Sequence, residues 1–160
     1  NESYSDIYGI IVSNINEPDV HSWNWQIGED LTETGLPLRD MSNPAAFGQP
    51  AHMDDYVVLD EDEDNGGVHV NSGIHNRAAF NLLMAAGAGG ARMFTPVEVA
   101  RMYYVTLVAH LSRTSGFADC RAGMLLAVQS MFAAAPDAEA RVAAVAEAYR
   151  AVGIVEPGAA

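Results

Sequence analysis

The chain has 160 residues, 21 acidic and 8 basic side chains, and a formal net charge of −13 at pH 7. This length suits one domain, so we expect residues 1–160 to form a single unit. The negative charge opposes binding to nucleic-acid phosphates or anionic lipids, and no apolar run reaches the roughly 18 residues of a membrane span. The single cysteine, Cys120, rules out an internal disulfide, and we expect it to be a small buried packing residue.

The first predicted element is an amphipathic helix over residues 1–16. Its core face is predicted to consist of Tyr4, Ile7, Tyr8, Ile11 and Ile15. Because the pattern is already running at Asn1 without a capping residue, we expect the helix to begin upstream in a longer protein. Glu2 and Asp6 share one face, where one carboxylate could ligate a cation while the other orients a neighbouring ligand. On spacing alone, two solvated acids are the commoner outcome.

Residues 17–68 are rich in Pro, Gly, Asp and Asn and show no sustained period, so we predict a long ordered loop. Loops of this length are uncommon in compact domains unless they are functional or clamped by neighbours. The acidic run from Asp60 to Asp64 invites a calcium-loop interpretation. Asn65 stands where an EF-hand needs Gly, and Asn71 stands where it needs a bidentate Glu, so a solvated loop is favoured.

The stretch "DNGGVHVNSGIHNRAAF" places Asp64 five residues before His69, with two glycines between them. A carboxylate that orients and charges the imidazole would make the ring a donor to a developing oxyanion. Gly66 and Gly67 would allow the tight turn that aims the ring. From these residues alone, a loop with a surface histidine remains the plainer interpretation. The spacing of His69 and His75 is not a familiar zinc spacing.

Four further helical patterns follow, at about 72–86, 96–111, 116–134 and 137–152. The second has the strongest start, because Thr95 can cap it, Pro96 occupies its first position and Glu98 closes a capping box. The short connections predict that these helices pack as a bundle.

Several segments together resemble one family, the thermolysin-like zinc metallopeptidases. "NESYSD" resembles its Asn-Glu-x-x-Ser-Asp helix, "WQIGEDL" its Ile-Gly-Glu-Asp segment, and "LRDMSNP" its Leu-Arg-x-Met-x-x-Pro segment. "DNGGVHVNSGI" resembles its Asp-Asn-Gly-Gly-Val-His-x-Asn-Ser-Gly-Ile signature. "FADCRAGML" and "AYRAVGI" fit its C-terminal helices, so the resemblance covers essentially the whole chain.

The resemblance implies a mainly α fold, an orthogonal helical bundle preceded by a long ordered loop region that faces an active cleft. It also implies a zinc endopeptidase in which Glu2 is the third zinc ligand and Asp6 orients a zinc-bound histidine. His69 would stabilise the tetrahedral intermediate, with Asp64 as its orienting partner.

The resemblance assigns the substrate contacts as well. Arg39 would bind a substrate carbonyl on the leaving-group side of the scissile bond. The pocket for a large apolar residue after the cut would be lined by Ile27, Leu31 and Leu38. The implied substrate is a peptide or protein, and the implied location is outside the cell.

The sequence also departs from the family pattern. The His-Glu-x-x-His helix, which supplies two zinc ligands and the general base, is absent. We therefore expect this chain to be the C-terminal half of such an enzyme, partnered by its N-terminal half and inactive alone. Ser13 and Gln26 stand at positions that are often acidic, and an insertion lies around residues 21–23. Since only Glu29 clearly remains, calcium at the family's double site is doubtful.

A rival from another class is a non-catalytic helical interaction domain that keeps the peptidase scaffold. A binding-only relative has no physical need for the full set of predicted functional side chains. That set comprises Glu2, Arg39, Asp64 and His69.

Overall fold

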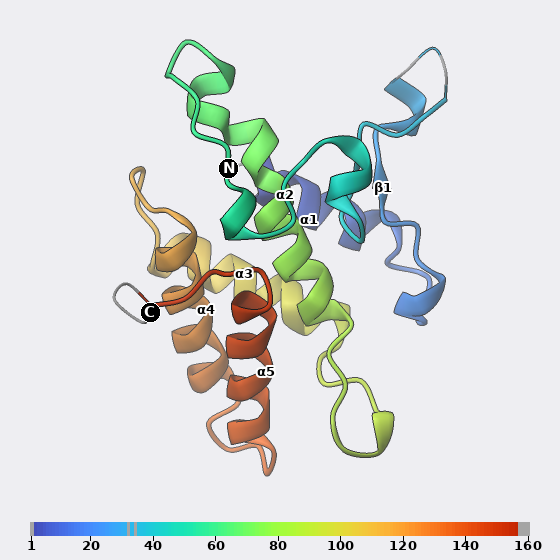
Figure 1. The fold of residues 1–160 in the computed structure, drawn as a ribbon. Coiled ribbons are helices and arrows are strands. Elements are labelled where there is room, and N and C mark those ends of the chain that lie inside the picture. The colour runs from blue at the N-terminus through green and yellow to red at the C-terminus, as the bar shows by residue number, and fades with distance from the viewer. Residues whose placement is uncertain (1, 32, 34, 157–160) are drawn as a thin grey trace. The chain divides into compact units, whose positions relative to one another are not determined.

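The computed structural model describes residues 2–31, 33 and 35–156 of the chain and is mainly α, which confirms the expected fold class. Its α-helices are α1 (Glu2–Ser13), α2 (Asp64–Leu83), α3 (Pro96–Ala109), α4 (Phe117–Met131) and α5 (Ala138–Arg150), shown in Figure 1. Residues 1–80 and 81–160 form two compact units, and the division falls inside α2. That the whole chain is one domain stays a prediction.

Helix α1 buries the predicted face in part. Tyr4, Ile7 and Ile11 are buried as expected, and Ile10 joins them. The prediction for Ile15 is wrong, since this side chain is 51% exposed. Helix α1 ends at Ser13, and the chain turns there with the Ile15 N–H donating to the Val12 carbonyl (3.3 Å), so Ile15 no longer follows the helical face.

Residues 14–63 are largely irregular, as predicted. Two two-residue strands, β1 (Gln26–Ile27) and β2 (Arg39–Asp40), pair antiparallel with Ile27 opposite Arg39. The other regular pieces described in this segment are short 3₁₀-helices, at Val20–Ser22, Glu29–Leu31, Pro44–Phe47 and Met53–Asp55. The β1–β2 pair fixes the backbone at Arg39 and so the point from which its side chain, a predicted substrate contact, extends.

Helix α2 becomes regular one turn earlier than the predicted start at about Ser72. Asp64, Asn65, Gly66 and Gly67 all have positive φ, between 50° and 82°, and helical geometry follows from Val68. The two glycines adopt a positive φ readily, whereas a positive φ is uncommon for a residue with a side chain, such as Asp64. This left-handed run brings the Asp64 carboxylate back onto the first turn of the helix, a local arrangement that hydrophobic periodicity does not report.

The irregular segment is held against α2 by close packing. A Cβ added to Gly73 would lie 2.7 Å from Gln49 Cβ and 2.7 Å from the Pro50 carbonyl oxygen, so only glycine fits there. Trp25 meets the Phe80 ring edge-on at 4.8 Å, and Trp23 lies 5.4 Å from Trp25. These contacts clamp the long loop, which is one of the two conditions under which such loops occur.

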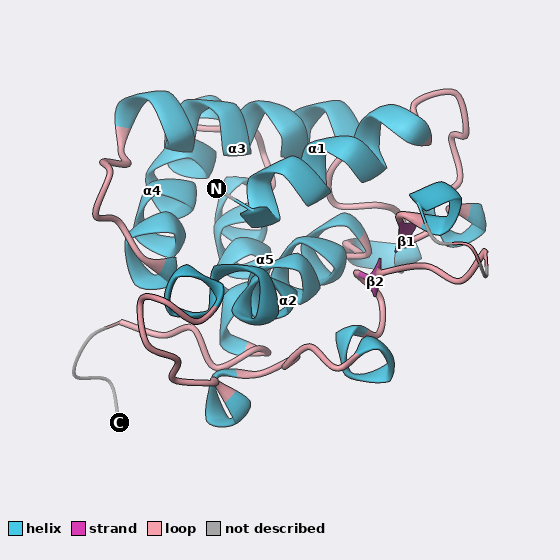
Figure 2. Cartoon of the chain, turned by 90° about the horizontal axis from the view of Figure 1, so that it is seen from above, coloured by secondary structure: helices cyan, strands magenta, loops and turns pink. Residues whose placement is uncertain are grey.

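Within residues 81–160, helix α4 packs against both α3 and α5. Helices α4 and α5 run alongside one another and α3 crosses their direction, as Figures 1 and 2 show. The capping box predicted at the start of α3 is present, with the Glu98 N–H donating to Thr95 Oγ1 (3.2 Å) and the Thr95 N–H donating to Glu98 Oε2 (2.7 Å). Gly123 permits the close approach of α4 to α3, because a Cβ there would lie 2.7 Å from Thr106 Cγ2.

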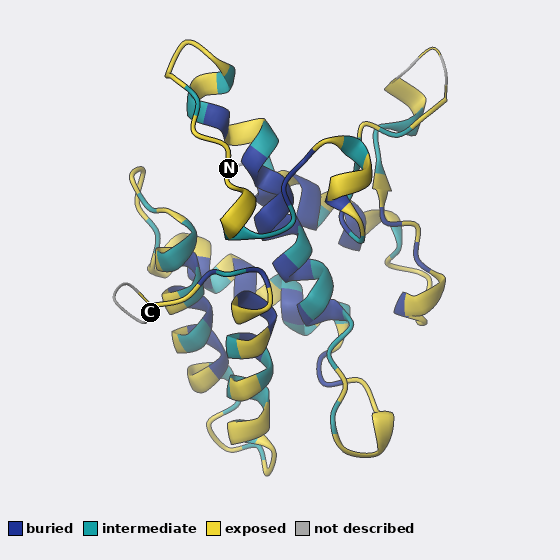
Figure 3. Ribbon diagram, in the orientation of Figure 1, coloured by how far each residue is buried: buried dark blue, intermediate teal, exposed yellow. Residues whose placement is uncertain are grey.

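The helices of this unit bury one side and expose the other, as the colours of Figure 3 show, and the buried residues are mainly apolar. Its fully buried side chains include Val99, Met102, Tyr103, Met124, Val128, Val145 and Tyr149. Cys120 is buried among them as predicted, with its sulfur 3.4 Å from the Tyr149 hydroxyl. None of the helices in the part of the chain that the structure describes is long and apolar enough to cross a bilayer.

Candidate active site

The structure brings three of the predicted site residues together. His69 Nε2 lies 3.1 Å from Glu2 Oε2, and His69 Nδ1 pairs with Asp64 Oδ1 on the other side of the ring. A carboxylate can only accept, so the hydrogen bond to Asp64 needs a hydrogen on Nδ1, and the contact with Glu2 pairs opposite charges only when the ring is an imidazolium. The side chains of His69 and Glu2 are 47% and 36% exposed, so the arrangement is open to a ligand.

Asp64 is fixed by more than the histidine. Its Oδ2 accepts hydrogen bonds from the backbone N–H groups of His69 and Val70, both at 3.0 Å, so the carboxylate caps the first turn of regular helix. The backbone N–H of Val70 and the His69 ring hold the pKa of the Asp64 carboxyl below its ordinary value. Asp64 is therefore a carboxylate at neutral pH. It caps the helix with Oδ2 and orients the His69 ring with Oδ1.

A second cluster surrounds Asp6, whose side chain is only 6% exposed. Arg39 Nη1 donates to both carboxylate oxygens of Asp6, at 2.9 and 3.0 Å. Asn76, on α2, donates to Asp6 Oδ2 at 2.8 Å. Both contacts with Arg39 use Nη1, so the remaining N–H groups of the guanidinium are not committed to Asp6.

A third polar contact lies inside the same unit. Ser3 Oγ is 2.8 Å from His75 Nδ1, both residues are buried, and the tilted rings of His75 and Tyr4 have centroids 5.9 Å apart. Burial lowers the pKa of His75 to about 3, so this imidazole is neutral at physiological pH. His75 therefore serves as a buried structural group that ties α2 to α1.

Sequence reasoning missed the buried polar side chains of α2 and of the loop beside it. Asn76 and Gln49 are both almost fully buried, and Gln49 Nε2 donates to the His69 carbonyl at 2.6 Å. A signal was present, because Ser72 and Asn76 are one turn apart on a helix that also buries Ile74, Ala78 and Leu82. Periodicity shows that such residues face inward, but it does not show which partner each one meets.

Of the three predicted pocket residues, Ile27 and Leu38 are neighbours and Leu31 is exposed. The Leu38 N–H donates to the Ile27 carbonyl at 2.9 Å, and the Leu38 side chain lies within 2.9 Å of where a Cβ on Gly28 would be. Leu31, in the following 3₁₀-helix, is 79% exposed. Ile27 and Leu38 thus lie together beside Arg39, while their role in lining a pocket stays a prediction.

The described residues fit zinc only in part. No group of three or more His, Cys, Asp or Glu side chains within the described ranges could hold a metal ion. Glu2 offers one exposed carboxylate, and a catalytic zinc site needs about three protein ligands. The described residues thus hold no complete zinc site, and the roles of Glu2 as a ligand and of Asp6 as its supporting acid stay predictions.

The Glu29 carboxylate meets an amide, and whether calcium binds in this segment stays a prediction. Asn24 Nδ2 donates to Glu29 Oε1 at 2.5 Å, and Asn24 is itself bonded to Asn14, which accepts from the Asn24 N–H at 3.3 Å. Gln26 stands nearby as an amide, and its N–H donates to Asn24 Oδ1. Calcium prefers several carboxylates, and here amide hydrogen bonds occupy the one that remains.

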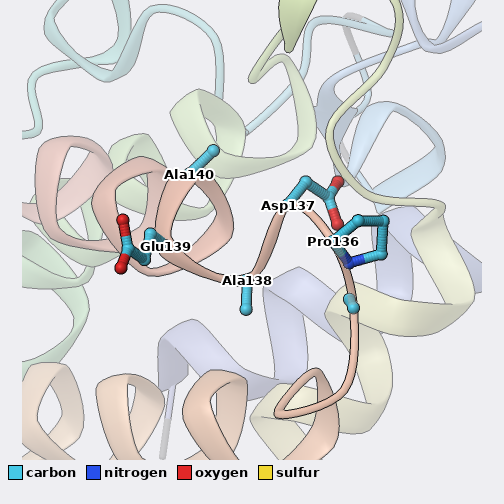
Figure 4. Close-up of a pocket in the computed structure, with 6 residues that line it drawn as sticks. Pro136, Asp137, Ala138, Glu139 and Ala140 are labelled. Carbon is cyan, nitrogen blue, oxygen red and sulfur yellow. The ribbon is translucent and has the colours of Figure 1, made fainter.

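A pocket elsewhere contains none of the predicted site residues (Figure 4). It lies at the turn before α5 and is lined by Ala135, Pro136, Asp137, Ala138, Glu139 and Ala140. The polar side chain Asp137 is already bonded to Arg141 Nε at 3.0 Å. Glu139 adds one exposed carboxylate, and the other lining residues are alanines and a proline.

Comparison with known proteins gives a match over nearly the whole chain. The family model described as "Thermolysin metallopeptidase, alpha-helical domain" matches residues 1–154.

Individual relatives agree with the family match. The chain is 36% identical over 135 residues to "Extracellular elastase" of Staphylococcus epidermidis, covering 82% of this chain and 23% of the relative. It is 35% identical over 156 residues to "Bacillolysin" of Bacillus amyloliquefaciens (96% and 26%). It is 36% identical over 163 residues to "Thermolysin" of Alicyclobacillus acidocaldarius subsp. acidocaldarius (96% and 28%). The chain thus spans about a quarter of the length of these three relatives.

Proposed function

This chain belongs to the thermolysin metallopeptidase family as its α-helical domain, and from that premise we propose that it is the C-terminal half of a zinc metalloendopeptidase. The observation that carries the proposal is the contact series from Glu2 through His69 to Asp64. It places one carboxylate suited to a metal directly beside an oriented imidazole, and the proposed zinc mechanism would use both.

Glu2 would act as one zinc ligand, with Asp6 as the acid that orients a histidine ligand from the other half. When bound, zinc supplies a Lewis acid that polarises the peptide carbonyl and activates water. Asp6 is buried and already held by Arg39 and Asn76, so its carboxylate is fixed before a histidine arrives.

His69 would donate from Nε2 to the oxyanion that forms at the attacked carbonyl. Asp64 accepts from Nδ1 and so leaves Nε2 directed outward, towards Glu2. The donor is thus oriented before the charge develops, and electrostatic stabilisation is most effective in that arrangement.

Arg39 would hold a substrate carbonyl on the leaving-group side with the N–H groups that Asp6 does not use. Ile27 and Leu38 lie next to it on the β1–β2 ladder, and Leu31 is exposed nearby in sequence. An apolar surface beside a carbonyl-binding arginine suits cleavage before a bulky apolar residue.

The remaining ligands and the general base would come from the N-terminal half of the same enzyme. One of the matched relatives is named as extracellular, and we extend secretion to this protein as part of the proposal. The chain alone would be inactive, because one ligand without a base cannot activate water.

The test compares the 160-residue chain with the full-length enzyme on a blocked peptide that has a bulky apolar residue after the scissile bond. The full-length enzyme should cleave it in a chelator-sensitive way, Glu2→Gln should abolish cleavage, and the chain alone should be inactive with added zinc. A matched control is Glu33→Gln, a change to an acid outside the predicted site.

Two results would contradict the proposal. A full-length protein that folds but shows no chelator-sensitive cleavage would favour the helical interaction domain. Cleavage by the purified chain alone, abolished by Glu2→Gln, would show that a complete site assembles within these residues.

A further inference from the structure

The residue that carries the inference is Asn76, a buried amide to which the sequence patterns assign no role. It is 1% exposed and donates through Nδ2 to Asp6 Oδ2 at 2.8 Å. Its own oxygen, Oδ1, is buried without a hydrogen-bond partner among the described residues.

This half-satisfied amide is a poor stabiliser. A buried acceptor without a donor costs stability, and an apolar side chain of similar volume would avoid that cost. What Asn76 does supply is a single directed donor at one oxygen of Asp6.

That donor restricts how Asp6 can turn. Arg39 Nη1 bridges both carboxylate oxygens, so on its own it would allow the carboxylate to rock about this single nitrogen. The bond from α2 to Oδ2 adds a second fixed point, and the two together define the carboxylate plane. Oδ1 is then the oxygen with a lone pair to spare, because it accepts from Arg39 alone among the bonds found in the described residues.

We propose that Asn76 is a positioning residue that locks Asp6, so that Oδ1 meets an incoming donor and Arg39 stays aimed at substrate. The inference rests on the proposed function, since it concerns the same site, and adds a residue on α2 to it. Asn76 acts through Asp6 and touches neither substrate nor metal. Its effect on catalysis should therefore disappear when Asp6 can no longer be positioned.

The test is a double-mutant cycle in the full-length enzyme, with Asn76→Leu, Asp6→Asn and the double variant. Asn76→Leu should lower kcat/KM by about tenfold, the lower end expected for loss of a supporting hydrogen bond at a metal site. In the Asp6→Asn background the same change should alter kcat/KM by less than about twofold.

The matched control is Asn71→Leu, which removes another buried amide of α2. Asn71 is bonded to the backbone of Val57, at 2.9 and 2.8 Å, and not to Asp6. Its substitution should lower thermal stability and change kcat/KM by the same factor in both backgrounds. If Asn76→Leu fails to fold by circular dichroism, Asn76→Ala takes its place in the cycle, because it removes the donor without placing a second carboxyl group beside Asp6.

The outcomes separate the two claims. Full additivity between positions 6 and 76, or an Asn76→Leu enzyme within about twofold of wild type, would overturn the positioning role while zinc-dependent cleavage stood. A wild-type enzyme without chelator-sensitive cleavage would overturn the proposed function and this inference with it.

Discussion

The two compact units both bury apolar side chains, and they differ in how many polar side chains they bury. Residues 81–160 bury apolar groups, and Thr106 is the one buried polar or charged residue that the structure describes there. The buried polar or charged residues described within residues 1–80 are Ser3, Asp6, Gln49, Asn71, Ser72, His75 and Asn76. All the predicted functional side chains also lie in this first unit.

The difference shows how one chain divides stability and chemistry. Apolar burial is non-directional and tolerates small adjustments, so it suits a helical scaffold. A buried polar group must meet its partner with defined geometry, because an unmatched one costs stability. The first unit meets this requirement with hydrogen-bonded polar groups, and these bonds fix the positions of Asp6, Arg39 and His69.

The largest expected effect is a pH dependence of stability that arises from His75. Its pKa falls from 6.5 to about 3 on burial, so below about pH 6.5 the unfolded chain binds a proton that the folded chain does not. The stability is fully present above pH 6.5 and is lost as the pH falls towards 3, by up to about 5 kcal/mol. Urea unfolding at a series of pH values measures this loss.

His75→Gln should remove most of that slope, even if it lowers stability at neutral pH. The control is His21→Gln, since His21 is exposed and its loss should leave the slope unchanged. An unchanged slope in His75→Gln would mean that carboxylates, rather than this buried imidazole, set the acid limit.

The next effect is on catalysis. In the full-length enzyme His69→Ala should raise the barrier by about 3–4 kcal/mol, seen mainly in kcat, because the donor acts on charge that develops in the transition state. His52→Ala is the matched control, since His52 is similarly exposed at 37% and lies outside the site. Near-normal turnover of His69→Ala would remove this residue from the mechanism.

A comparable but slightly smaller effect is expected in the apolar unit. Met124 is fully buried on α4, so Met124→Ala should lower the free energy of unfolding by about 3 kcal/mol at any pH between 5 and 8. Leu126→Ala on the same helix is the control, because Leu126 is 51% exposed and should change stability by about 0.5 kcal/mol or less. A loss of stability that depends strongly on pH in Met124→Ala would contradict the claim that apolar burial alone stabilises the second unit.

The smallest effect is that of calcium. Because Asn24 occupies the Glu29 carboxylate, the thermal midpoint of the chain should be the same in excess calcium and in chelator. Asn24→Asp should create a calcium response, since it places two carboxylates together. A calcium-dependent midpoint in the unchanged chain would show that the segment recruits ligands that the amide bonds now occupy.

Much of the helical framework could be predicted from local signals. The capping box at Thr95 and Glu98 set the start of α3, and apolar spacing marked α1 and the C-terminal helices. These signals are reliable because caps and periodicity act within one turn or one face. The same reasoning misplaced Ile15, which follows the spacing but lies beyond the last turn of α1.

The candidate site could be predicted only in part. Family resemblance singled out Glu2, Asp64 and His69, and the structure brings them into contact. Nothing local marked Asn76 as the partner of Asp6, although the two are bonded across 70 positions of sequence.

The sequence by itself determined the helices, their caps and the types of side chain that face inward, because these depend on neighbours within a few residues. Only the tertiary structure decided which buried polar groups meet. A hydrogen bond requires a donor and an acceptor that lie within about 3 Å of one another and are correctly aligned. The spacing of residues along the chain does not give the distance between atoms on α1, β2 and α2, because these elements are far apart in sequence.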